Sequence, residues 1–143
     1  MLAKSGLQIR RTACVLDPDP ELGDPASMAQ ITALHIYPVK SCRGLALDRA
    51  RITPTGFEHD REWMIVRPDG RFITQREEPR LALIEPTLMT DGLQLRAPGA
   101  EPLLTPYAAA HAELQVVCWR DACAAFDAGP HAARWLSELL GAP

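Results

Sequence analysis

The sequence predicts a mainly β domain, a β-barrel with α+β character, made of about nine short antiparallel strands and one C-terminal helix. Three observations carry this prediction. Short runs rich in β-branched and aromatic residues recur between turn signals, the 143 residues include 13 Pro and 9 Gly, and helical periodicity appears only near the end. A chain of this length suits one domain with a real core.

In the first half of the domain, strands are expected at residues 31–37, 45–53 (a short pair), 62–67 and 71–74. Pro38 cannot donate to a ladder, so the first strand ends there. Residues 62–67 are apolar on both faces through their middle, which is typical of a central, covered strand. The Pro-Asp-Gly turn that follows returns the chain as a hairpin.

In the second half, strands are expected at residues 81–84, 87–90, 93–96, 103–104, 114–119 and 122–127. Pro86 favours an edge position or a bulge for its strand. Asp91-Gly92 is a strong hairpin signal, and the last two strands are expected to turn around Arg120-Asp121. Residues 105–113 fit a helix or a loop equally well.

The helix is expected at the end of the chain, with Pro130 in its first turn and Gly141 as its C-cap. Its apolar residues follow helical spacing and form one stripe: Ala132, Trp135, Leu136, Leu139 and Leu140. This stripe must pack on something. The barrel itself and a second domain outside this sequence are both open at this point.

Residues 1–27 differ from the rest of the sequence. Their first part is basic, and residues 17–25 are acidic and interrupted by prolines, which predicts a disordered leader or a true start at Met28. The domain therefore spans residues 28–143. No run approaches the roughly 18 apolar residues of a membrane helix, and no signal peptide is evident, so a cytoplasmic location is expected. The net charge of −3 disfavours nucleic acid as a partner.

A local anion site is predicted between Pro38 and Gly44, where a loop carries Lys40, Ser41 and Arg43. An ammonium, a hydroxyl and a guanidinium together suit a phosphate. Lysine is rare here, because the sequence has 13 Arg and Lys40 is the only lysine outside the leader. The competing interpretation is an ordinary solvated turn.

Two further cations belong to the candidate site. Arg61 precedes the buried strand, so its guanidinium must pair with Asp60 or face a ligand. Arg76 follows the returning hairpin strand and would lie near the same end, unless it pairs with Glu77 or Glu78.

The four cysteines indicate neither a zinc site nor a disulfide framework. No C-x-x-C occurs, and for Cys118 and Cys123 two reduced thiols are favoured over a disulfide. The four histidines are scattered, and no nucleophile-histidine order indicates a hydrolase.

Four segments together resemble the N-terminal β-barrel domain of MOSC proteins, from about Ile31 to the end of the chain. They are YPVKSCRG at 37–44, DR at 60–61, FITQR at 72–76 and AARWLSELLG at 132–141. The resemblance implies a molybdopterin-type molybdenum cofactor, contacted by Lys40, Ser41 and Arg61, with Arg43 and Arg76 adding positive charge. It implies no metal ligand and no catalytic residue in this chain, because Cys42 matches a non-ligand position.

The resemblance also implies a role in an oxidoreductase that reduces N-oxygenated compounds. In complete members a MOSC domain follows the barrel and supplies the molybdenum-binding thiolate, so activity from this chain alone is not expected. A MOSC domain or an electron-transfer protein is the expected partner. The alternatives are a non-catalytic, stand-alone barrel that binds an anionic ligand, or a partner through the helix stripe, and a truncated, inactive fragment.

Overall fold

The computed structural model describes residues 2–4, 30–107 and 113–141. It is mainly β with one α-helix, as expected, and every pairing between its strands is antiparallel. The strands are β1 (Leu2–Lys4), β2 (Leu34–Ile36), β3 (Leu45–Leu47), β4 (Ile52–Thr53), β5 (Gly56–Phe57), β6 (Trp63–Ile65), β7 (Glu85–Leu88), β8 (Gly92–Ala97), β9 (Ala100–Pro106), β10 (Glu113–Cys118) and β11 (Asp121–Asp127). A 3-10 helix spans Pro79–Leu83, and α1 spans Pro130–Leu140.

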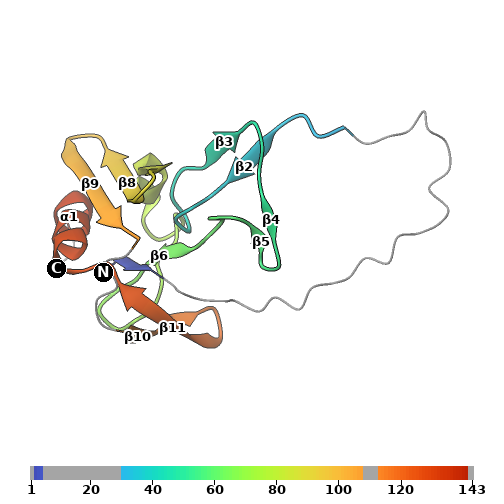
Figure 1. The fold of residues 1–143 in the computed structure, drawn as a ribbon. Coiled ribbons are helices and arrows are strands. Elements are labelled where there is room, and N and C mark those ends of the chain that lie inside the picture. The colour runs from blue at the N-terminus through green and yellow to red at the C-terminus, as the bar shows by residue number, and fades with distance from the viewer. Residues whose placement is uncertain (1, 5–29, 108–112, 142–143) are drawn as a thin grey trace.

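The strands form two larger sheets and two hairpins. One sheet has the order β10-β11-β1-β6, the other the order β7-β8-β9, and β2-β3 and β4-β5 are separate pairs. Helix α1 lies beside β8 and β9, and the β10-β11 hairpin extends away from them on the far side of β6 (Figure 1). Of the expected leader, only residues 2–4 are described, and they form a strand between β11 and β6 rather than irregular chain. The rest of the leader lies outside the described residues.

The strand predicted at residues 81–84 is wrong, because this segment is largely a 3-10 helix. Pro79 starts the helix, and the Glu78 side chain accepts a hydrogen bond from the Arg80 backbone N–H. Leu81 and Ile84 are both buried and three residues apart, which is the repeat of a 3-10 helix. The apolar run therefore follows a helical period that was mistaken for a strand.

Three other expectations need correction. Residues 45–53 do not pair with each other, because β3 pairs with β2 and β4 pairs with β5. Cys118 pairs with Asp121, so the last hairpin turns at Trp119-Arg120 rather than Arg120-Asp121. The returning strand at 71–74 is reduced to two isolated bridges, Val66 with Phe72 and Arg71 with Val117. Residues 108–112, most of the ambiguous segment, lie outside the described residues.

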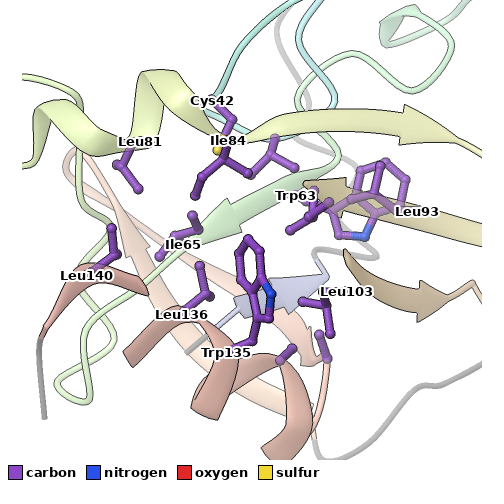
Figure 2. Packing of buried hydrophobic residues seen from close by; sticks show 14 of the residues in the cluster. Cys42, Trp63, Ile65, Leu81, Ile84, Leu93, Leu103, Trp135, Leu136 and Leu140 are labelled. Atoms are coloured by element: carbon purple, nitrogen blue, oxygen red, sulfur yellow. The ribbon is translucent and has the colours of Figure 1, made fainter. Parts of the chain in front are cut away.

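The expected helix is confirmed, and its apolar stripe packs on the chain's own core. Trp135, Leu136 and Leu140 are buried in one cluster with residues of β6, β8 and β9, and Gly141 caps the helix at φ 59°. Figure 2 shows Trp135 and Leu136 turned toward Ile65 of β6. The Trp135 indole N–H donates to the Glu101 carbonyl at 2.6 Å. The largest side chains of the stripe are therefore covered by the chain's own core, whereas Leu139 stays partly exposed.

Strand β6 is covered on both faces, as the sequence predicts, but it lies at the end of its sheet and not at the centre. Trp63 and Ile65 join the core under α1, whereas Met64 and Val66 join a second cluster beneath the β10-β11 hairpin. Alternate residues of one short segment thus hold two cores together. Within the part of the chain that the structure describes, no helix has the length and apolar character needed to cross a lipid bilayer.

Candidate functional site

The predicted anion-binding loop lies directly beside the segment that precedes β6. Val39 forms a parallel bridge with Trp63, and the Lys40 N–H donates to the Trp63 carbonyl at 2.8 Å. Two residues earlier, the Arg61 N–H donates to the Tyr37 carbonyl, also at 2.8 Å. The backbone therefore brings Lys40 and Arg61 onto neighbouring segments, although 20 residues separate them in the sequence.

These two segments hold an unusual backbone. Ser41, His59 and Arg61 have φ values of 68°, 64° and 55°, which is the left-handed region that non-glycine residues seldom adopt. Such positions cost free energy, and they persist where the surrounding structure imposes them, often at ligand sites. The loop and the segment before β6 therefore carry backbone strain next to the candidate cations.

Lys40 is partly buried, and its ammonium lies close to two aromatic rings. Its Nζ lies 4.8 Å from the centroid of the Phe72 ring and 5.1 Å from that of Trp119. Both distances are within the range of a cation–π contact. Among the described residues no carboxylate pairs with this ammonium. Its positive charge is therefore not neutralised by an acid of the described chain.

Arg61 is held by two neighbours, as the sequence allowed. Its guanidinium pairs with the Asp60 carboxylate and lies 5.2 Å from the centroid of the Tyr37 ring. Asp60 also accepts a hydrogen bond from the Tyr37 backbone N–H at 2.8 Å. The Arg61 side chain remains 55% exposed. The Arg61 guanidinium is thus held in place by Asp60, while part of it still faces solvent.

Gly44 makes room for the Tyr37 ring on which Arg61 lies. A Cβ at this position would come within 2.8 Å of Cε1 of Tyr37, closer than real side chains approach. A larger residue would displace the ring and, with it, the surface beneath Arg61. The close approach of the Tyr37 ring therefore explains why glycine stands at the end of the loop motif.

Arg43 points away from the other candidate cations. Its guanidinium pairs with Glu85 of β7, and its backbone N–H donates to the Ile84 carbonyl at 3.0 Å. The pair borders a shallow depression of about 300 Å³ between β3 and β7. Because its charge is compensated and directed at β7, Arg43 contributes less to an anion site than its neighbour Lys40.

Arg76 is exposed and makes no ion pair with any residue in ranges 2–4, 30–107 and 113–141. Both of its expected partners are engaged elsewhere. A hydrogen bond from Arg71 lowers the pKa of Glu77, and one from Arg80 lowers the pKa of Glu78. Arg76 thus keeps its charge available, but no contact joins it to Lys40.

Cys42 belongs to the core, although its neighbours belong to the site. Its side chain is 1% exposed, and burial raises the pKa of the thiol to about 12. A protonated, enclosed thiol is a poor nucleophile and a poor metal ligand. Across the described residues no group of three or more His, Cys, Asp or Glu side chains is placed to hold a metal ion, and Cys42, Cys118 and Cys123 are free thiols.

Trp119, whose ring lies 5.1 Å from the Lys40 ammonium, is a site residue that is not among those predicted from the sequence. The sequence predicts this tryptophan at the end of a strand, whereas it occupies the β10-β11 turn with φ 62° and is 69% exposed. A signal was present, because Gly, Asn or Asp usually fills such a position. A tryptophan in a two-residue turn is therefore a departure worth noting in any sequence.

The arrangement can bind an anion. Lys40 supplies an ammonium that pairs with no carboxylate of a described residue, and Ser41, which is partly exposed, adds a hydroxyl next to it in the chain. Arg61, on the neighbouring backbone segment, adds an oriented, partly exposed guanidinium. Phosphate oxygens accept hydrogen bonds from all three donor types. The donor set therefore fits the phosphate of a cofactor.

Comparison with known proteins identifies a family for most of the chain. A family model described as "MOSC N-terminal beta barrel domain" matches residues 28–143. The molybdenum cofactor sulfurase of Drosophila grimshawi is 38% identical over 120 residues, which are 78% of this chain. The mitochondrial amidoxime reducing component 2 of Rattus norvegicus is 42% identical over 80 residues, 53% of this chain. Component 1 of Mus musculus is 36% identical over 116 residues, 77% of this chain.

The chain spans only part of these relatives. The matched region is 16% of the Drosophila sulfurase, 24% of the rat protein and 34% of the mouse protein. Among solved structures, the solution structure of a Bordetella bronchiseptica protein is similar with a TM-score of 0.50 and 25% identity. That match covers 62% of this chain and 76% of the other. The family assignment thus rests on the family model and the sequence relatives, and the solved structure independently supports the fold.

Proposed function

Because this chain belongs to the family of MOSC N-terminal beta barrel domains, we propose that it supplies anion contacts to a molybdenum cofactor of the molybdopterin type. The observation that carries the proposal is the pairing of the 37–43 loop with the segment before β6. It brings Lys40, Ser41 and Arg61 onto adjacent backbone, and Lys40 has no carboxylate partner among the described residues.

Each of these residues has its own part in holding the cofactor phosphate. The Lys40 ammonium provides the charge, the Ser41 hydroxyl donates a hydrogen bond, and the exposed N–H groups of Arg61 donate from a fork that Asp60 keeps oriented. Arg43 and Arg76 raise the surrounding positive potential. When bound, the cofactor supplies the redox chemistry, and the protein supplies position and charge.

The metal-binding thiolate comes, in this proposal, from a MOSC domain on the same or another polypeptide. Cys42 does not suit that role, because burial keeps its thiol protonated. The complete assembly would be an oxidoreductase that reduces N-oxygenated compounds, with an electron-transfer protein as its partner. Support for this comes from two relatives that are named as amidoxime reducing components.

The proposal is tested on protein purified from its native source, after its intact mass has been measured. Molybdenum and molybdopterin contents are compared between the unaltered protein, Lys40→Ala and the control Arg96→Ala. Arg96 is an exposed cation on β8 that bonds only to Gln94 among the described residues. A charge-assisted hydrogen bond worth about 1.5–3 kcal/mol corresponds to a tenfold or larger loss of affinity.

We expect Lys40→Ala to lower the molybdopterin content at sub-saturating cofactor, and Arg96→Ala to leave it unchanged. Equal content in all three proteins would contradict the assignment of Lys40. Protein that carries no molybdopterin at all, in a host that makes the cofactor, would favour the stand-alone barrel that binds another anion.

A further inference from the structure

Trp119 is a large aromatic residue in a position that usually takes glycine. It is the first residue of the two-residue turn between β10 and β11, its φ is 62°, and it is 69% exposed. Neither the backbone strain nor the exposure is explained by burial of apolar surface. A bulky residue retained at such a position indicates a role for its ring.

The ring is held in a defined place over the candidate anion site. The Phe72 ring contacts it edge-on at 5.1 Å between centroids, and the Lys40 ammonium lies 5.1 Å from its centroid. The hairpin is tied to the chain beside Phe72, because the Val117 N–H donates to the Gly70 carbonyl at 3.0 Å. Phe72 itself is buried, so the indole rests on a fixed support.

We propose that Trp119 and Lys40 together bind a planar heteroaromatic anion, which stacks on the exposed indole and pairs with the ammonium. The inference rests on the proposed function and adds a ring-binding residue to it. Offset stacking on an aromatic face is favourable, and tryptophan offers the largest such face. The flexible lysine stem lets the ammonium stay beside the rings and turn its N–H groups toward an anionic substituent.

The same geometry selects against two other kinds of ligand. Lys40 repels a planar cation, because no described carboxylate neutralises its charge. A bare phosphate can pair with Lys40 but gains nothing from the indole. The site therefore calls for a molecule that carries both a flat ring and a negative charge, as a pterin with an anionic substituent does.

The test uses the 143-residue chain and three probes: pterin-6-carboxylate (ring and charge), inorganic phosphate (charge alone) and 6-hydroxymethylpterin (ring without the anionic substituent). Binding is followed by the polarisation of pterin emission and by quenching of tryptophan emission. Trp63 and Trp135 are 0% and 8% exposed, so the quenchable signal comes mainly from Trp119.

We expect pterin-6-carboxylate to bind most tightly and to quench the exposed tryptophan in a saturable way. Trp119→Gly and Lys40→Gln should each weaken its binding at least tenfold, whereas Arg120→Ala, which removes a neighbouring cation of the same turn, should not. Thermal unfolding serves as the folding control, because glycine suits the backbone at position 119 and should leave the midpoint close to that of the unaltered chain.

Three results would overturn the inference: no saturable quenching, equal affinity of Trp119→Gly and the unaltered chain, or displacement by phosphate as effective as by the pterin. Failure of the parent proposal looks different. A loss of molybdopterin in Lys40→Ala but not in Trp119→Gly would retain the cofactor role and reject the stacking role. Tight pterin binding by a protein that carries no molybdopterin would retain the stacking role and reject the cofactor role.

Discussion

Two regions of the molecule differ in the residues that adopt a positive φ. One surrounds α1 and the β8-β9 turn, and the other surrounds the candidate site. Around α1 and the β8-β9 turn, the described positions that need positive φ hold Gly99, Gly129 and Gly141. Around the candidate site, positive φ falls on four non-glycine residues, Ser41, His59, Arg61 and Trp119, as well as on Gly56 and Gly70. Among the described residues, the first region uses only the residue that adopts this conformation without strain, whereas the second also uses residues that carry side chains.

The difference teaches where stability and function are separated in this fold. The glycine-capped side buries Trp135, Leu136 and Leu140, and the Trp135 indole N–H donates to the Glu101 carbonyl. The strained side displays side chains that a glycine could not provide, namely a hydroxyl, a guanidinium and an indole. Strain of this kind is expected where a side chain is retained for binding rather than for folding.

The largest effect should come from exchanging one tryptophan on each side. Trp135→Ala removes a buried ring and its hydrogen bond to Glu101, so we expect a loss of about 3–5 kcal/mol in the free energy of unfolding. Trp119→Gly removes exposed ring contacts and relieves a left-handed backbone, so its effect should stay within about 1 kcal/mol. Urea denaturation measures both values. Comparable losses in the free energy of unfolding for the two variants would contradict the proposed difference between the two regions.

Cys42 tests where the boundary between the two regions lies, because it follows Ser41 in the loop but packs in the core. Burial raises the pKa of its thiol to about 12 from 9.0, so the folded protein keeps the proton that the unfolded chain releases above pH 9. Its contribution to stability is fully present below pH 9 and is lost as the pH rises toward 12, by about 1.4 kcal/mol per pH unit.

The measurement is urea denaturation at several pH values between 8 and about 11, with Cys42→Ala as the reference. The slope due to Cys42 is the difference between the two proteins, since Tyr107 and Cys123 also have raised pKa values and contribute in both. Parallel pH profiles would mean that the thiol is solvated and belongs to the loop.

A smaller effect is expected at the helix cap. Gly141→Ala places a Cβ on a residue with φ 59°, with space around it, so only backbone strain is added. We expect a loss of about 1 kcal/mol in the free energy of unfolding. An unchanged value in urea denaturation would show that the glycines of this region are not needed for their conformation.

The smallest effect is expected for the opposite change, in which a non-glycine residue with positive φ is replaced by glycine. Ser41→Gly relieves φ 68° but adds freedom to the unfolded chain, so the free energy of unfolding should stay unchanged or rise by less than about 1 kcal/mol. The hydroxyl is lost with it, so the affinity for pterin-6-carboxylate should fall. A clear loss of stability, as for Gly141→Ala, would remove the distinction between the two sides.

Much of the fold was predictable because local chemistry decides it. Pro38 and Gly44 bound the loop, and the apolar middle of 62–67 placed β6 between two layers. The helix begins at Pro130 and is capped by Gly141, as expected. The 3-10 helix escaped prediction because a short apolar run such as 81–84 fits either period until Glu78 and Pro79 are recognised as its start.

The candidate cations are visible in the sequence by residue type, and so is Asp60, the partner of Arg61. The acid that pairs with Arg43 was not predictable, because it is 42 residues away in β7. The role of Trp119 depends on hairpin register and on the approach of Val117 to Gly70, neither of which a local pattern encodes. Long-range pairing therefore decided which charges remain available.

The most direct test of the account is the environment of the Lys40 ammonium. The sequence has two lysines, Lys4 and Lys40, so reductive methylation with 13C gives one methyl signal for each, besides that of the N-terminal amine, and keeps the positive charge. The account predicts that the Lys40 signal is shifted upfield by the Phe72 and Trp119 rings and moves when pterin-6-carboxylate is added. A Lys40 signal at the position of a free lysine, unmoved by the pterin, would contradict it.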